Sequence, residues 1–302
     1  MSAWLATLLL ALSSCAFTQK IVLTNDDGWA VAQIRAQNDA LVAAGFNVIL
    51  SAPAENESGT GSSSATPKVL TEPCEFDTCP TGSPAEGFNA SNTRLNYVNS
   101  FPVDAVRFGI QTLAPQFFDS PPDFIVSGPN VGNNLGSGVT GSGTVGAACE
   151  AALEGFPSAA FSGDTASQVS FTTLTTSPNS IDTLAALTYA SLTTSLTSAL
   201  LASSARPVLP AGVTLNVNFP STSSCPDASD FSFVLTRLVT DSSATDVETC
   251  GTDHLPVEST AVREGCFVTV TVLNATSKAD VDAATQGAVL DRLSGFLSCL
   301  PS

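Results

Sequence analysis

Short runs of β-branched and apolar residues alternate with longer segments of helical spacing along most of the chain. Residues 21–24 predict a strand, and residues 29–44 predict a helix that ends at Gly45. Residues 47–51 predict a second strand. Strand, helix and strand in this order form a βαβ unit, which implies parallel strands joined by a right-handed crossover.

The alternation continues further along the chain. The remaining predicted helices and buried strands of this part are helix 102–113, strand 123–127, helix 142–153, strand 158–162 and helix 181–202. Repeated alternation of strands and helices predicts an α/β fold with a mostly parallel, doubly wound sheet and helices on both faces. Residues 52–92, rich in Ser, Gly and Pro, are expected to form a surface loop over one edge of the sheet.

The last hundred or so residues have a different pattern. Residues 213–218, 231–239 and 266–273 alternate like strands, and residues 279–300 predict a closing helix. We expect these strands to extend the same core and to be partly antiparallel. Residues 17–302 are therefore interpreted as a single domain.

The chain of 302 residues is acidic, with 10 Lys and Arg against 27 Asp and Glu and a formal net charge of −17. This charge excludes binding to a nucleic-acid polymer or an anionic membrane through bulk electrostatics. A hydrophobic fraction of 43% with only 12% charged residues is typical of a compact globular protein. His254 is the single histidine, which excludes metal sites that need two imidazoles.

Residues 1–16 combine a short apolar run with small residues and predict a secretory signal peptide. The alternative is a buried first strand or helix. No later apolar stretch is judged long enough to span a membrane, so we expect a secreted, extracellular protein without a membrane partner.

Seven cysteines remain after the predicted signal peptide. An odd number leaves one thiol unpaired, and Cys149, within a run of small residues, is expected to be the buried free thiol. Cys74 and Cys79 are close enough for a short bridge, while the other pairings stay open. Disulfides are favoured over a metal site because the chain has no CxxC pair.

Polar residues follow three predicted strands, at 25–28, 56–59 and 127–130. In a parallel sheet the ligand crevice lies outside the carboxyl ends of the strands. Asp26 and Asp27 would repel each other there unless a cation compensates them, which predicts a metal site. Oxygen ligands favour Mg²⁺, Mn²⁺ or Ca²⁺ over Zn²⁺ or Cu²⁺. The alternative is a simple turn in which Asp27 caps the next helix.

A second candidate is the helix start at Ser142, Gly143 and Thr144. Small residues leave the first backbone N–H groups accessible, and the helix dipole favours an anion such as phosphate. Ordinary capping by Ser142 is the alternative unless the two Asp residues lie next to this helix. Residues 136–141 match G-x-G-x-x-G by chance, because they do not follow a strand directly.

Three motifs together resemble the SurE family of metal-dependent phosphatases and nucleotidases. They are IVLTNDDG (21–28), APAENESG (52–59), and VSGPNVGNNLG with SGTVGAACE (126–136 and 142–150). The resemblance implies a Rossmann-like core and divalent-metal hydrolysis of small phosphate monoesters, notably nucleoside monophosphates. Residue by residue, it implies metal binding by Asp26, Asp27, Ser58 and Asn130. We also expect Asp26 or Asp27 to orient or deprotonate the attacking water. The expected phosphate- or substrate-binding residues are Asn134, Ser142, Gly143 and Thr144.

The chain departs from the family pattern after the Asp pair, at residues 29–32, and before the helix, where Gly141 replaces an aromatic residue. Both changes border the expected substrate pocket, which keeps open a catalytically silent secreted binding protein with the same fold. A serine esterase is disfavoured because the chain has no G-x-S-x-G motif.

Two further expectations concern the surface of the protein. Glycosylation sequons begin at Asn56, Asn89 and Asn274, and we expect glycans at Asn89 or Asn274 because Asn56 lies beside the presumed ligand Ser58. A monomer stapled by disulfides is preferred over a homodimer.

Overall fold

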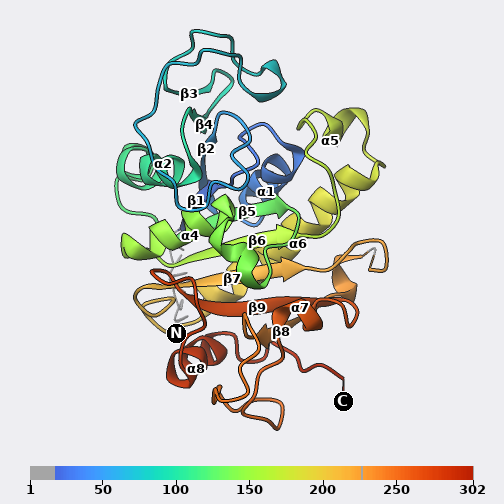
Figure 1. Ribbon diagram of the computed structural model, residues 1–302. Helices are drawn as coiled ribbons and strands as arrows, with labels where there is room; N and C mark the ends of the chain where they lie inside the picture. The colour runs from blue at the N-terminus through green and yellow to red at the C-terminus, as the bar shows by residue number, and fades with distance from the viewer. Residues whose placement is uncertain (1–17, 226, 302) are drawn as a thin grey trace, which may run out of the picture.

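The computed structural model describes residues 18–225 and 227–301, so the predicted signal peptide lies outside the described residues. Within this part of the chain, nine strands form one sheet in the order β3-β4-β2-β1-β5-β6-β7-β9-β8. Figure 1 shows them following one another from β3 at the top of the view to β8 near the bottom. The strands are β1 Lys20–Thr24, β2 Asn47–Pro53, β3 Glu86–Asn89, β4 Asn92–Val98, β5 Phe124–Val131, β6 Ser158–Gly163, β7 Val213–Phe219, β8 Ser232–Thr236 and β9 Phe267–Asn274.

Strand directions confirm the predicted α/β class. The six neighbours β4, β2, β1, β5, β6 and β7 run parallel. At one edge β3 is antiparallel to β4. At the other, β9 is antiparallel to β7 and β8 is parallel to β9, which matches the prediction that the C-terminal strands extend the core and are partly antiparallel.

Helices cover both faces of the sheet. They are α1 Ala32–Ala43, α2 Pro102–Phe108, α3 Ala114–Phe118, α4 Gly143–Leu153, α5 Thr173–Thr176, α6 Ile181–Ala202, α7 Glu258–Ala261 and α8 Ala283–Arg292. Short helical turns of other types are η1 Glu75–Asp77, η2 Gly109–Leu113, η3 Gly136–Thr140 and η4 Ala228–Asp230. Successive residues of β1 enter different cores: Ile21 and Leu23 pack with side chains of α1 and α6, while Val22 packs with α2, η2 and α4. Burial on both faces explains why the central strands are continuously apolar.

Helix α6 is 22 residues long and apolar enough, by length and composition, to cross a membrane, with a mean hydropathy of 1.3. The expectation that no later stretch reaches this length is therefore wrong. More than half of its apolar window is buried inside the protein. Ala186 and Ala190 pack against Ala32 and Ala36 of α1, and these small side chains allow the two helices to approach closely.

The boundaries of several elements differ from the sequence prediction. The expected loop 52–92 contains β3, and β4 follows it, so an antiparallel hairpin replaces an irregular edge. Strand β5 continues to Val131 through a register shift between Ser127 and Asn130. Helix α8 covers Ala283–Arg292, whereas the sequence predicted a helix over 279–300. After α8 the chain turns at Gly295, which has a φ of +79°.

Disulfides join Cys74 to Cys79, Cys225 to Cys266 and Cys250 to Cys299. Cys149 is free and buried. The structure thus confirms the expected short bridge and the expected free thiol. The bridge between Cys250 and Cys299 fixes the C-terminal tail beside β8. There the Ser298 N–H donates to the Phe233 carbonyl at 2.7 Å, so the tail covers part of this sheet edge.

Candidate active site

The order of the strands brings the four expected metal ligands to one edge of the sheet. β2, β1 and β5 are neighbours, and their carboxyl ends point the same way. Asp26 and Asp27 follow β1, Ser58 follows β2, and Asn130 lies at the end of β5. The motifs that carried the prediction are therefore close in space (Figure 1).

Asp26 is almost fully buried and lies against the first turn of α4. The Thr144 hydroxyl donates a hydrogen bond to Asp26 Oδ1. A Cβ atom on Gly143 would lie 2.8 Å from Asp26 Cβ, so a side chain at Gly143 would collide with this carboxylate. The Ser142 hydroxyl caps the helix by accepting from the Val145 N–H at 3.1 Å. The acidic loop therefore lies next to the expected anion site. This adjacency favours an anion site at the start of α4 over simple capping by Ser142.

Asp27 is fully buried, and hydrogen bonds hold both of its oxygens. The Val131 N–H donates to Oδ2 at 2.8 Å, and the Gln168 side-chain amide donates to Oδ1. Gln168 comes from the loop after β6. It also lies 3.4 Å from Ser58 Oγ and accepts from the Asn56 amide at 2.7 Å. Gln168 thus connects two expected ligands, and sequence analysis missed it because a lone Gln in a Ser- and Thr-rich loop gives no signal.

The two neutral ligands are more accessible. Ser58 is exposed, and its hydroxyl donates to Asn56 Oδ1 at 2.7 Å. The Asn130 amide donates to the Gly132 carbonyl at 2.6 Å, while Asn130 Oδ1 accepts no hydrogen bond from the described residues. Ser58 Oγ is therefore open to solvent, while Asn130 is buried and keeps Oδ1 free of donors from the described residues.

Burial and mutual repulsion control the charge of the Asp pair. Burial, followed by the negative charge of Asp26, raises the pKa of Asp27 to about 8. Burial also raises the pKa of Asp26. Within the described residues, no Lys, Arg or His forms an ion pair with either carboxylate. The neighbouring Asn25 Oδ1 is buried without a hydrogen-bond partner.

A divalent metal ion fits this environment, because it would compensate two buried carboxylates that pair with no cation in residues 18–225 and 227–301. The donor set consists of carboxylate, hydroxyl and amide oxygens, which suit Mg²⁺, Mn²⁺ or Ca²⁺. In the part of the chain that the structure describes, no three His, Cys, Asp or Glu side chains cluster as a metal site. A metal would therefore need Ser58 and Asn130 in addition to Asp26 and Asp27.

Glu75 is a third acidic group near the site that sequence analysis did not identify. It lies in η1, inside the loop closed by the Cys74–Cys79 bridge, and its Oε2 is buried without a partner. A Cβ atom on Gly28 would lie 2.2 Å from this oxygen. Burial raises the pKa of Glu75 to about 7, assisted by the charge of Glu55.

Trp29 explains one departure from the family pattern. Its ring is buried, and its Nε1 donates to Thr78 Oγ1 at 3.0 Å in the same disulfide-closed loop. The residue therefore serves to dock this loop behind the acidic pair.

Asn134 was expected to bind substrate, and in the structure it fixes the loop after β5. Its side-chain amide donates to Ser162 Oγ at 2.8 Å, and its backbone N–H donates to Asn218 Oδ1 at 2.8 Å. Glu258, which sequence analysis also missed, accepts from the Gly136 N–H at 2.8 Å and from Thr271 Oγ1 at 2.6 Å. Burial raises the pKa of Glu258 to about 7. The C-terminal strands thus support the loop that leads into α4.

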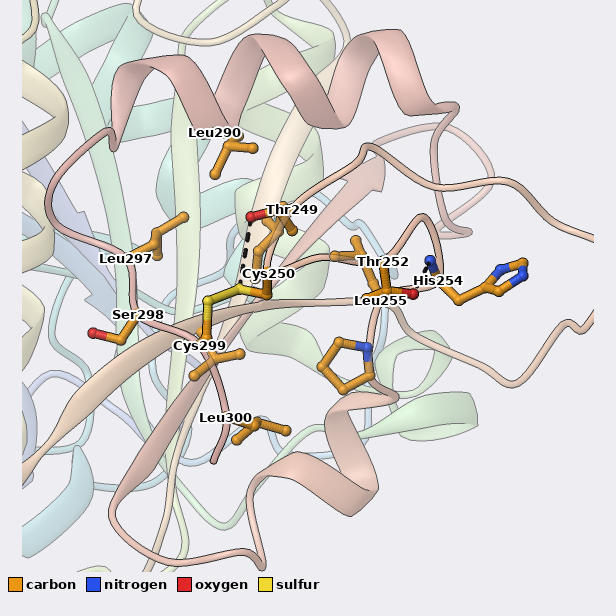
Figure 2. A pocket seen from close by; sticks show the side chains of 13 residues that line it. Thr249, Cys250, Thr252, His254, Leu255, Leu290, Leu297, Ser298, Cys299 and Leu300 are labelled. Carbon is orange, nitrogen blue, oxygen red and sulfur yellow. Dashed lines mark hydrogen bonds between the residues drawn. A yellow bond between two sulfur atoms is a disulfide. The ribbon is translucent and has the colours of Figure 1, made fainter. Parts of the chain in front are cut away.

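His254 lies far from the acidic pair. It lines a mostly apolar cavity of about 350 Å³ between β8 and the C-terminal tail. Figure 2 shows its ring at the margin of this cavity, pointing away from Leu290 and Leu297. β8 is five strand positions from β1, or roughly 24 Å at the usual strand spacing. His254 therefore does not contact Asp26 or Asp27.

Comparisons with known proteins agree with this geometry. The family model described as survival protein SurE matches residues 21–245. The chain is 41% identical over 206 residues to an acid phosphatase of Yarrowia lipolytica, covering 66% of this chain and 56% of the relative. It is 37% identical over 142 residues to the 5′-nucleotidase SurE of Lawsonia intracellularis, covering 47% of this chain and 50% of the relative. The chain thus spans about half the length of these curated relatives.

A solved structure supports the fold. The SurE protein from Aquifex aeolicus superimposes with a TM-score of 0.58 at 24% identity, covering 85% of this chain and 93% of that one. The family-model match extends over both the acidic loop and the α4 start. The chain belongs to the SurE family.

Proposed function

We propose that the chain hydrolyses phosphate monoesters with a divalent metal ion held by Asp26, Asp27, Ser58 and Asn130. The observation that carries the proposal is a buried carboxylate pair that is packed against the start of α4 and has no cationic partner among the residues that the structure describes. Acid phosphatase and 5′-nucleotidase are the names of the relatives, which supports the same reaction class.

Residues of the chain have separate tasks in this reaction. A bound divalent cation supplies charge neutralisation at the phosphate oxygens and a lower pKa for water. Thr144 orients Asp26, while Val131 and Gln168 orient Asp27. Either Asp26 or Asp27 positions or deprotonates the attacking water. Water adds to phosphorus, the bond from phosphorus to the leaving oxygen breaks, and the products are an alcohol and inorganic phosphate.

The start of α4 provides space and positive potential for the phosphate. Gly141 and Gly143 have no side chains, and the helix dipole of α4 favours negative charge at this end. Ser142 and Thr144 hold the turn in place through their bonds to Val145 and Asp26. Nucleoside monophosphates are included in the proposed substrate class because relatives are named as 5′-nucleotidases.

Secretion is part of the proposal. Three disulfides in one chain are typical of proteins that fold outside the cytosol. The signal-like residues 1–16 would direct export.

The test compares hydrolysis of p-nitrophenyl phosphate and p-nitrophenyl acetate, each with and without EDTA. We expect turnover of the phosphate only, its loss in EDTA and its recovery with excess Mg²⁺ or Mn²⁺. Phosphate turnover that survives EDTA contradicts the metal site. Turnover of the acetate alone supports a serine esterase, and turnover of neither by folded protein supports the silent binding protein.

A further inference from the structure

A cavity with both polar and apolar lining lies beside the candidate site, at the carboxyl ends of the next strands of the sheet. Its volume is about 380 Å³. Asn133, Asp164 and Ser221 line it from the segments that follow β5, β6 and β7. Arg263 lines it from the turn between α7 and β9. The cavity is thus built by the same sheet edge that carries Asp27.

Two segments connect the cavity to the acidic pair. Val131, whose N–H binds Asp27, is two residues before Asn133. Asp164 and Gln168 belong to one loop, and Gln168 also binds Asp27. Because neighbouring strands are about 4.8 Å apart, the segment after β6 lies about 10 Å from Asp27, and the turn with Arg263, which leads into β9, lies about 19 Å away. A leaving group on a phosphate bound at Asp26 and Asp27 would enter this cavity if it extended along the sheet edge from β1 towards β7.

Arg263 is an unusual cation in this chain. Of the 10 Lys and Arg residues, only Lys68 and Arg263 make no side-chain hydrogen bond or ion pair with the described residues. The chain carries 27 Asp and Glu, so the supply of acidic partners is large. An exposed guanidinium that faces a cavity without an ion pair is available to an anionic ligand.

The composition of the lining bears on the kind of leaving group that the cavity holds best. None of the described residues that line the cavity is aromatic, so the cavity offers no ring for stacking a base or an aryl group. Hydroxyl, amide and carboxylate groups from Ser221, Ser224, Asn133 and Asp164 instead provide hydrogen bonds to hydroxyl groups. The chemistry fits a hydroxylated leaving group that carries negative charge.

We propose that this cavity binds the leaving group of the substrate and that Arg263 recognises a second anionic group on it, a carboxylate or a second phosphate. This inference rests on the proposed phosphomonoesterase function. Arg263 is then a specificity residue: it binds the part of the substrate that does not react, through the two parallel hydrogen bonds that a guanidinium makes with an oxyanion.

The experiment uses three substrates with one carbon skeleton: glucose 6-phosphate, 6-phosphogluconate and glucose 1,6-bisphosphate. The first has no second anion, the second has a carboxylate and the third has a second phosphate. We measure kcat/KM for phosphate release by the wild type, Arg263→Gln and Arg206→Gln. Arg206 is the charge-matched control, because it binds backbone carbonyls before β7, at the opposite edge of the sheet.

We expect the wild type to prefer at least one doubly anionic substrate about tenfold, the effect of one charge-assisted hydrogen-bond pair. Arg263→Gln should lose this preference through a raised KM, with glucose 6-phosphate within about twofold of wild type. Comparing 6-phosphogluconate with glucose 1,6-bisphosphate then identifies whether the carboxylate or the second phosphate is preferred.

Equal losses on all three substrates, an equal change in Arg206→Gln, or no preference in the wild type would overturn the role of Arg263. Hydrolysis of p-nitrophenyl phosphate separates these results from failure of the proposed function. If that reaction persists while the preference is absent, only the Arg263 inference falls. If that reaction is absent from folded protein, both proposals fall.

Discussion

Two groups of buried carboxylates in this chain differ in whether a cation of the chain accompanies them. In the C-terminal part, Arg237 Nη1 lies 2.9 Å from Asp246 Oδ2, and Arg237 Nη2 lies 3.6 Å from Asp280 Oδ2. The Gln286 amide also donates to Asp246 Oδ1 at 2.8 Å. Asp26 and Asp27, at the carboxyl edge, accept hydrogen bonds but have no cation within the described residues.

The difference shows which group of charges is structural and which awaits a ligand. A buried ion pair satisfies itself, so Arg237 and its partners need nothing from outside the chain. A buried carboxylate pair without a cation destabilises the fold on its own, and such strain is a common feature of functional sites. The four predictions that follow test this contrast.

The largest effect is expected from Asp27→Asn. This change keeps the shape of the side chain but removes a charged ligand, which should lower phosphatase turnover on the order of a thousandfold, since several kcal/mol of transition-state stabilisation depend on the metal. Circular dichroism should show an intact fold. Turnover close to wild type would exclude Asp27 from the site.

Arg237→Met should act on stability instead. It leaves Asp246 and Asp280 without their cation and should lower the free energy of unfolding by about 3–5 kcal/mol. Arg107→Met is the matched control, because Arg107 is more exposed and its pairs with Asp104 and Glu150 should contribute about 1 kcal/mol or less. Urea titration measures both, and equal effects of the two variants would contradict the contrast.

The pH dependence of metal-free protein should report the unpaired carboxylate. The pKa of Asp27 is about 8 in the folded state against an ordinary 3.8, so the folded state retains a proton that the unfolded state has lost. The contribution of Asp27 to the free energy of unfolding is therefore full below about pH 4, and it is lost as the pH rises towards 8. Glu75 and Glu258 act in the same direction because their pKa values are raised to about 7.

Between pH 4 and pH 8, the melting temperature of Asp27→Asn should fall by several degrees less than that of the wild type. Calorimetric scans between pH 4 and pH 8 in EDTA compare the two proteins. Parallel declines would show that Asp27 does not cause the pH dependence.

Gln168→Ala should give the smallest effect. Gln168 positions Asp27 and reaches Ser58 without being a ligand, and loss of such a supporting residue costs about 10- to 100-fold in metal affinity or activity. Gln111→Ala removes a comparable amide bond, to Glu154 on the surface, and should change nothing. Equal metal affinity in Gln168→Ala and wild type would show that Gln168 does not position the metal ligands.

Strongly patterned elements could be predicted from the sequence. α6 begins and ends where its periodicity indicated, and β1 and β6 differ from prediction by one residue. The β3–β4 hairpin was missed because its strands begin with polar, exposed residues. The closing helix was predicted too long because residues after Arg292 keep an apolar pattern while they pack as a tail against β8.

The same contrast holds for the site. Asp26 and Thr144 are 118 residues apart, and only the motif resemblance connected them. Gln168 is 141 residues from Asp27, and its role depends on a loop whose position the sequence does not encode locally. Glu75 and Glu258 likewise reach their places through a disulfide-closed loop and an appended strand layer.

Metal binding itself tests the central claim most directly. Isothermal titration with Mn²⁺ and Mg²⁺, after treatment with EDTA and dialysis, measures stoichiometry and affinity without any substrate. We predict one site per chain in the wild type and affinity weakened at least about a hundredfold in Asp26→Asn and in Asp27→Asn, since each loses a charged ligand. No binding by the wild type, or unchanged binding by both variants, would contradict the assignment of this carboxylate pair to a metal ion.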